Sequence, residues 1–281
     1  MTTPTDTITE LQKSNPSEII ELFEVHLDQR LHYADWEANK AYTAGDTVSS
    51  TSLLLDNSFP PQGMVFECTS GGTSGGSLPS GFALAIEGGT ITDNGVTWTA
   101  KRPIKRFHAG TNLKTTTTLH EASIHFDGKV FEPFPIIAEG FAQSSSGTLP
   151  RPRLTISNLN PSLAASFSVA NGGSALPSGT ITSMMLEVNK ITVGNDLIGS
   201  TLVRIRTLRK FLPDENFNSA NSTANPTEKF PEDIYMIVRK VVENQEIVQF
   251  ECAMPNDEFG IRLPRRQILP SEFPAIGEFF Q

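Results

Sequence analysis

A serine in a glycine-rich loop is the first residue whose type and spacing could support covalent chemistry. Ser74 lies in GTSGG, residues 72–76, which formally matches the G-x-S-x-G turn that presents a nucleophilic serine. That turn needs a buried strand before it and a helix after it, whereas here glycine and serine continue on both sides. We therefore predict a structural loop and not a nucleophile.

The other candidates for acid–base or metal chemistry lack supporting spacing. Asp214 and Glu215 follow Pro213 in FLPDENF, a turn context in which carboxylates cap the backbone. No phosphate-binding loop, dinucleotide fingerprint or metal-ligand spacing occurs. The histidines likewise show no HExxH or Cys/His pattern: His26, His32, His108, His120 and His125. The sequence favours a protein that is not an enzyme, with no cofactor and no metal.

Composition indicates a β-rich protein. The chain has 281 residues, of which 38% are hydrophobic and 19% charged, and its 21 glycines and 19 prolines are typical of many turns. The net charge of -9 disfavours nucleic acid as a partner. No stretch approaches the roughly 20 apolar residues of a membrane span, and no signal peptide is visible, so we expect synthesis in a cytoplasm. Cys68 and Cys252 are predicted to be buried apolar thiols.

Hydrophobic periodicity places most elements. Asp127-Gly128 between two alternating runs is a strong hairpin signal, and Asn244 and Gln245 mark a second turn. Asp6 or Thr7 can cap a short helix. Strands are predicted over residues 17–28, 151–159, 200–212 and 234–254, and further short helices over 161–173 and 183–190.

Residues 33–102 differ in composition and are predicted to form a small β-rich module inserted into a larger domain. The order W-x5-Y-x2-G-D-x-V, from Trp36 to Val48, with Trp98 near its end, resembles the small carbohydrate-binding modules of chitinases and many phage tail proteins. The resemblance implies that Trp36, Tyr42 and Trp98 stack on sugar rings. The alternative is that these aromatics, with Phe66, form the module's own core.

The remaining sequence resembles the minor tail protein L family of lambda-like phages. The resemblance rests on FEVHL, FDGKVFEPFPIIAEGF, RPRLTISNL and the P-x-R-x-I at 264–268, and it covers residues 1–32 and 103–269. It implies a discontinuous tail-hub β-barrel or sandwich domain, residues 1–32 and 103–281, in the tail tip of the virion. Its partners would be other tail-tip proteins, and it would form a homotrimer or another ring. A glycan-degrading or cell-wall-degrading enzyme anchored by the inserted module is the alternative function.

Within that resemblance, several residues are predicted to make assembly contacts. We expect Arg151 and Arg153 on a strand edge held straight by Pro152, where the alternative is that they make exposed salt links. The other predicted contact residues lie near the C-terminus: Arg265, Arg266, Phe279 and Phe280. Related proteins carry a cysteine-rich region that resembles an iron–sulphur site. Because no cysteine follows Cys252, we expect no such cluster here.

Overall fold

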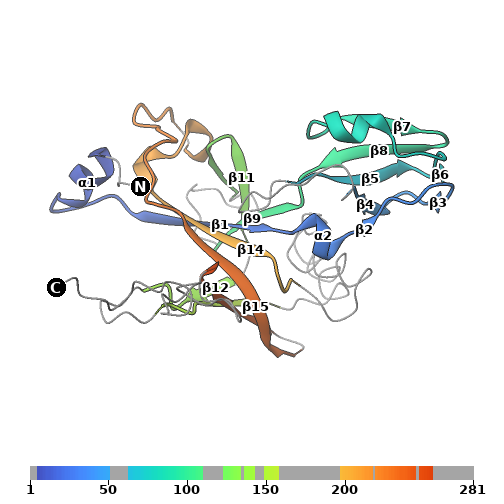
Figure 1. Cartoon of the computed structure of the whole chain (residues 1–281). Helices are drawn as coiled ribbons and strands as arrows, with labels where there is room; N and C mark the ends of the chain where they lie inside the picture. The colour runs from blue at the N-terminus through green and yellow to red at the C-terminus, as the bar shows by residue number, and fades with distance from the viewer. Residues whose placement is uncertain are drawn as a thin grey trace, which may run out of the picture.

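The protein folds mainly into β-strands arranged as two lobes (Figure 1). The structure, a computed structural model, describes residues 5–50, 63–109, 123–133, 136–142, 149–157, 197–217, 219–244 and 247–255. The predicted mainly β fold is confirmed. The helices predicted over 161–173 and 183–190 lie outside these residues.

The larger lobe is built on a nine-stranded sheet. Its strand order is β10-β11-β9-β1-β14-β15-β16-β13-β12, and its neighbours are antiparallel except β11 and β9. The strands in this order are Ile124–Phe126, Lys129–Pro133, Ile104–His108, Ile19–His26, Thr201–Leu208, Asp233–Glu243, Ile247–Ala253, Arg153–Ser157 and Ile136–Glu139.

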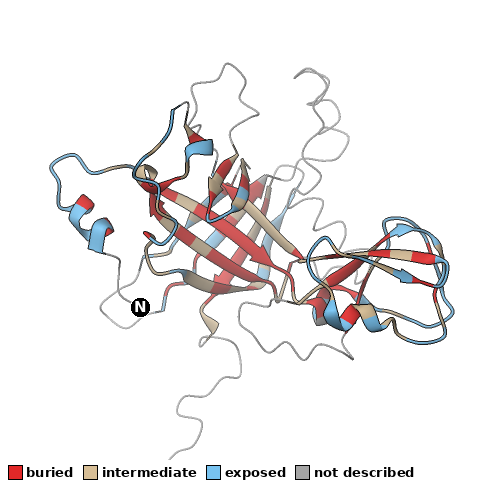
Figure 2. Ribbon diagram, turned by 90° about the horizontal axis from the view of Figure 1, so that it is seen from above, coloured by how far each residue is buried: buried red, intermediate tan, exposed pale blue. Residues whose placement is uncertain are grey.

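Strand β1 is an interior strand of the large sheet and is buried on both faces. Figure 2 shows that buried residues run through the middle of the larger lobe. Phe23 and Val25 join one apolar cluster, while Ile20 and Leu22 join a second cluster on the opposite face. This division follows from the two-residue period of a strand. The sheet curls, as the contact between Phe23 and Phe141 shows. Phe141 follows the edge strand β12, yet its ring centroid lies 6.4 Å from that of Phe23 on β1.

The hairpin β10–β11 closes the second cluster. Asp127 and Gly128 both have positive φ, 52° and 68°, as the predicted two-residue turn requires. Asn216, in the short 3-10 helix η3 (Asp214–Asn216), holds the hairpin by bonding both the N–H and the C=O of His125, at 2.8 and 2.7 Å. Phe126 and Phe131 are then fully enclosed.

The smaller lobe contains only strands from residues 34–101. Its five-stranded sheet has the order β2-β4-β5-β8-β7, and a two-stranded sheet pairs β3 with β6. In chain order these are β2 Ala34–Asp35, β3 Ala41–Tyr42, β4 Thr47–Ser49, β5 Val65–Ser70, β6 Gly72–Thr73, β7 Thr90–Asp93 and β8 Val96–Lys101, with the 3-10 helix η1 at Ser80–Leu84.

The chain enters and leaves the smaller lobe along adjacent strand ends. The Leu27 N–H donates to the Pro103 carbonyl at 3.0 Å, next to the β1–β9 pair. Tyr33 and Val65 belong to the core cluster of the larger lobe, so the junction is packed as well as hydrogen-bonded.

The remaining helices are short and held by polar contacts. They are α1 Thr5–Leu11, α2 Gln29–His32 and the 3-10 helix η2 Arg209–Phe211. Thr7 donates to the Glu228 carboxylate from its N–H and its hydroxyl, at 2.9 and 2.8 Å, which holds α1 to the body. Within the described residues, no helix is long and apolar enough to cross a membrane.

Helix α2 places a buried histidine at the junction of the two lobes. His32 has no exposed surface, and its Nε2 lies 3.2 Å from the Ser200 hydroxyl. Burial lowers the pKa of His32 to about 4, although the nearby Asp28 carboxylate acts to raise it. The folded protein therefore holds this imidazole neutral at pH values where the unfolded chain protonates it.

Acid should weaken the fold through His32. The folded pKa of His32 lies below its unfolded value, so the neutral imidazole favours the folded state. This contribution to the free energy of unfolding is fully present above pH 6.5 and is lost as pH falls toward 4, by up to about 3 kcal/mol. Urea unfolding of the wild-type protein at pH 7 and at pH 4.5 should show this loss of unfolding free energy. In His32→Gln the fall between the same two pH values should be smaller. If the unfolding free energy of His32→Gln fell with pH as steeply as that of wild type, His32 would not be the cause of the acid sensitivity.

Candidate functional site

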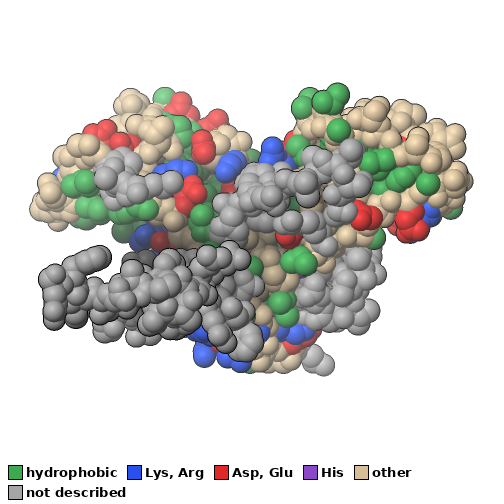
Figure 3. Space-filling model, in the orientation of Figure 1, with side chains coloured by type: hydrophobic (Ala, Val, Ile, Leu, Met, Phe, Trp, Pro, Cys, Tyr) green, Lys and Arg blue, Asp and Glu red, His purple; other side chains and the backbone are tan. Residues whose placement is uncertain are grey.

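An open cleft of about 620 Å³ lies where the two lobes meet. Lys and Arg side chains gather at the notch between the lobes in the space-filling view (Figure 3). The cleft is lined by β1, β9, the β10–β11 hairpin and two residues of the smaller lobe, Glu87 and Arg102. The complete lining is Glu24, His26, Glu87, Arg102, Ile104, Arg106, Gly128, Lys129 and Val130. Charged groups from both lobes converge in this cleft.

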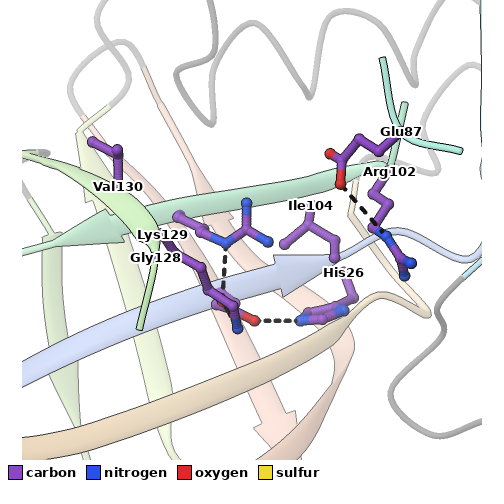
Figure 4. Close-up of a pocket in the computed structure, with 9 residues that line it drawn as sticks. His26, Glu87, Arg102, Ile104, Gly128, Lys129 and Val130 are labelled. Carbon is purple, nitrogen blue, oxygen red and sulfur yellow. Dashed lines mark hydrogen bonds and ion pairs between the residues drawn. The ribbon is translucent and has the colours of Figure 1, made fainter. Parts of the chain in front are cut away.

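A buried carboxylate organises the floor of this cleft. Glu24 is only 3% exposed, and its Oε1 accepts hydrogen bonds from Arg106 Nε and Lys129 Nζ, each at 3.0 Å. Its Oε2 lies 2.9 Å from His26 Nε2. At the module end of the cleft, Arg102 pairs with Glu87 at 3.5 Å, and Val130 lies at the opposite end (Figure 4).

Strand geometry brings these groups together. Glu24 and His26 are two residues apart on β1, so both point to the same face. Arg106 is directly opposite Glu24 in the β1–β9 register, and Lys129 follows the turn glycine of the hairpin. Sequence reasoning missed this cluster because its members lie far apart in the chain and form no motif.

The basic neighbours control the ionisation of Glu24. Desolvation by burial acts to raise its pKa, but the hydrogen bond to His26 and the charges of Lys129 and Arg106 outweigh it and lower the pKa to about 2. The carboxylate is therefore ionised throughout the physiological range. Because Arg106 and Lys129 together carry two positive charges against one negative charge, the floor of the cleft keeps an excess positive charge.

The structure places the predicted sugar-stacking aromatics largely inside the smaller lobe. Trp98 is fully buried and Tyr42 is 5% exposed, with their rings in edge contact at 4.9 Å. Neither ring presents a face to solvent, so burial contradicts a stacking role for these two residues. Trp36 is half-buried and packs against the same core. The alternative prediction, that the aromatics with Phe66 form a core, is confirmed for the buried rings.

One carboxylate holds both tryptophans. Asp93 Oδ2 accepts hydrogen bonds from Trp36 Nε1 at 2.8 Å and from Trp98 Nε1 at 3.1 Å. Its Oδ1 accepts from the Gly75 N–H at 2.8 Å. Sequence reasoning did not single out Asp93, because its position at the β7–β8 turn resembles an ordinary turn residue.

The candidates for chemistry take structural roles. Ser74 is buried; its hydroxyl donates to the Glu37 carbonyl at 2.8 Å and accepts from the Lys40 N–H at 3.0 Å. Asp214 caps the Asn221 N–H at 2.7 Å, as predicted for a turn former. Among the described residues, no group of three or more His, Cys, Asp or Glu side chains could hold a metal ion.

Both cysteines are free and buried, as predicted. Burial raises the pKa of Cys252 to about 12, with a further contribution from the Glu251 carboxylate. A thiol with this pKa stays protonated and unreactive at neutral pH. Cys68 is likewise raised above its ordinary pKa by burial.

The predicted strand edge at Arg151 and Arg153 is wrong. Strand β13 pairs with β16 on one side and β12 on the other, so its backbone is not available to a neighbouring subunit. The Pro152 carbonyl accepts from the Cys252 N–H at 2.8 Å. Arg151 and Arg153 are themselves exposed, and Arg151 pairs with Glu251 at 3.3 Å, as the salt-link alternative predicted. Arg265, Arg266, Phe279 and Phe280 lie outside the described residues.

Strand β14 carries arginines whose side chains are partly buried in the larger lobe. Val203 and Ile205 lie in one apolar cluster, while Arg204 on the opposite face is largely buried. Arg204 pairs with Glu21 and Asp233, and its guanidinium lies 4.5 Å from the Phe141 ring centre. The strand therefore does not present Arg204 on a solvated face.

Comparison with known proteins assigns this architecture to a family. The family model described as phage minor tail protein L matches residues 99–173 and 168–275. The matched region begins at the end of β8 and contains every strand of the nine-stranded sheet except β1. The large sheet thus lies mostly within the segment that matches a phage tail protein family.

The chain belongs to the phage minor tail protein L family, which confirms the resemblance found in the sequence. It is also similar to tail tip protein L of Escherichia phage lambda, with 29% identity over 106 residues. That similarity covers 38% of this chain and 35% of the lambda protein. The protein is accordingly a structural component of a phage tail.

The pairing of Glu24 should appear in the pH dependence of stability. The folded pKa of Glu24 is lowered to about 2, so the ionised carboxylate favours the folded state. This contribution to the free energy of unfolding is fully present above pH 4.5 and is lost as pH falls toward 2, by up to about 3 kcal/mol. Glu24→Gln should unfold at lower urea concentration than wild type at pH 7, and the difference should shrink toward pH 2. Glu67→Gln, which alters a surface pair, should change stability by less than about 1 kcal/mol. If the difference in unfolding free energy between wild type and Glu24→Gln stayed constant from pH 7 to pH 2, this account would be wrong.

Proposed function

We propose that this chain is a subunit of the tail tip of a long non-contractile phage tail, where it links the end of the tail tube to the receptor-binding apparatus. The observation that carries the proposal is the family match across residues 99–275, which contains eight of the nine strands of the large sheet. The similarity to a protein named tail tip protein L supports the location. Its proposed partners are copies of itself, in a trimer or another ring, and the neighbouring tail-tip proteins.

The proposed domain division assigns residues 1–32 and 103–281 to the tail domain and residues 33–102 to an inserted module. The adjacent entry and exit strands support it, because an insertion is tolerated where its two ends lie close together. Separate sheets also support it, as does an apolar cluster whose members all lie within residues 33–102. In this arrangement the module projects beside the sheet and is free to meet other tail proteins or the host surface (Figure 1).

The absence of an iron–sulphur cluster remains part of the proposal. The last cysteine in the sequence, Cys252, points into the apolar core of the sheet with a protonated thiol. A cluster requires about four thiolate ligands, and the chain has two cysteines in two different cores.

The tail assignment predicts that the protein is present in purified virions. Mass spectrometry should detect it in isolated tails, and immunogold labelling should place it at the tip. Phage lacking the gene should form no infectious particles, and the wild-type gene supplied in trans should restore them. A variant with a Gly-Ser linker in place of residues 34–101 should still enter tails, because the nine-stranded sheet is retained. Tails that assemble normally and never contain the protein would refute the proposal.

The alternative enzyme assignment can be tested on the same material. The purified chain should leave peptidoglycan and chitin intact in a zymogram, with lysozyme and chitinase as positive controls. Clearing that survives further purification would support the glycan-degrading alternative.

Glycan binding by the module is proposed through Trp36. Half-buried, with its Nε1 held by Asp93, this indole is the one of the three predicted aromatics that keeps part of its surface open. A ring fixed in this way loses little entropy when a sugar packs against it. A host-surface glycan is therefore a proposed second partner of the tail tip.

Trp36→Ala should weaken glycan binding by up to about tenfold, since a stacked aromatic contributes roughly 0.5–1.5 kcal/mol beyond its buried area. Glycan arrays and binding to host cell walls provide the measurement, and thermal unfolding verifies that the variant is folded. Trp36→Phe is the matched control and should retain most of the affinity. Equal binding by wild type and Trp36→Ala, or no glycan binding by either, would exclude this role.

A further inference from the structure

We propose that the cleft between the two lobes is a docking site for an acidic protein segment of a neighbouring tail subunit. The inference rests on the proposed function, because it assumes that the chain meets other tail proteins. The docking cleft consists of Arg102, Arg106, Lys129, Ile104 and Val130 around the buried Glu24 (Figure 4). None of these residues was among the predicted assembly contacts.

The cationic groups of the docking cleft are fixed before any partner arrives. Glu24 holds Arg106 and Lys129 at 3.0 Å each, yet their side chains remain 24% and 35% exposed. A cation anchored at one point and open at another presents charge without the entropy cost of ordering a free side chain. Preorganisation of this kind is characteristic of a binding surface.

Charge selects an anionic occupant. Arg102, Arg106 and Lys129 carry three positive charges, and the lining residues Glu24 and Glu87 carry two negative charges. The protein as a whole has a net charge of -9, so the docking cleft is locally basic on an acidic molecule. Complementary potentials of this kind set the orientation of two partners and the rate at which they meet.

Apolar side chains around the docking cleft favour a protein segment over a small anion. Ile104 and Val130 line it, and Val130 is 45% exposed. In the sequence, Glu87 follows two further exposed aliphatic residues, Leu84 and Ile86, which are 85% and 75% exposed. Exposed aliphatic groups beside arginine are typical of the core of a protein interface. A segment with carboxylate side chains and aliphatic neighbours would satisfy both features.

Occupation of the docking cleft would bury surface of both lobes. Its lining comes from β1, β9 and the hairpin of the larger lobe and from Glu87 and Arg102 of the smaller lobe. A segment that contacts both sides would add to the packed junction formed by Tyr33 and Val65.

Val130 allows a test that leaves the Glu24 cluster intact. Val130→Glu places a negative charge in the docking cleft and should lower incorporation into tails by at least about tenfold. Val130→Lys also removes the aliphatic side chain, but it adds a charge that attracts an acidic segment, so it should enter tails several-fold better than Val130→Glu. Val242→Glu, at a valine that is 38% exposed on β15, controls for the general effect of a new surface carboxylate. Thermal unfolding must show all three variants folded.

The outcomes separate this inference from the tail assignment. If the wild-type protein is found in tails and Val130→Glu enters tails at the same level, the docking proposal is wrong and the tail assignment stands. Equal loss with Val130→Glu and Val130→Lys would also overturn it, since charge would then be irrelevant. Wild-type protein absent from tails would overturn the tail assignment itself.

Purified protein permits a direct measurement. Fluorescein-labelled hexaglutamate should bind at low ionic strength, should be released at about 1 M salt, and should bind more tightly than labelled hexalysine. Glu87→Gln removes one negative charge and should strengthen this binding several-fold, whereas Val130→Glu should weaken it. Binding of inorganic phosphate without binding of hexaglutamate would show a small-anion site and overturn the proposal.

Discussion

The burial of strand β1 on both faces is the constraint on which the structure depends. Its backbone is paired to β9 and β14, so its side chains are divided strictly between two apolar clusters. Beyond the apolar residues of the second face, the same period places Glu24 and His26 in the cleft between the lobes. One residue further, Leu27 pairs with Pro103 and the chain passes into the smaller lobe. A single strand thus connects the core, the basic cleft and the module.

Carboxylates shared between two cations recur through the larger lobe. Glu24 is bonded by Arg106 and Lys129, Glu251 by Arg151 and Arg239, and Asp233 by Arg204 and Arg206, with each carboxylate little exposed. A buried pair offers limited net stability because desolvation opposes the attraction, but removing one partner is costly. These clusters therefore specify which strands lie side by side. They also concentrate positive charge at defined places on an acidic protein.

Most aromatic residues of the module fill its interior and do not form an exposed surface. A lobe of this size has few large side chains, and it uses Trp98, Tyr42, Phe66 and Phe82 to fill its interior. Phe66 and Phe82 stack with their ring centres 3.7 Å apart. The likeness to carbohydrate-binding modules correctly grouped the aromatics, but it could not tell which ring faces solvent. That distinction depends on long-range packing, because Tyr42 and Phe82 make edge contacts with Trp98 while Trp36 packs against the outside of the same cluster.

The sequence alone determined the β-rich class, the strands at β1, β13, β14, β15 and β16, the Asp127-Gly128 hairpin and the tail-protein family. These features depend on local periodicity, turn residues and motif order, which a linear chain displays directly. Only the tertiary structure decided that β13 is an interior strand, that Trp98 is core and that Glu24 gathers Arg106 and Lys129 in a cleft. Strand neighbours far apart in sequence decide each of these, since β13 lies between β12 and β16 and Lys129 is 105 residues from Glu24. Local pattern specifies which face of a strand is apolar, but long-range pairing determines what that face meets.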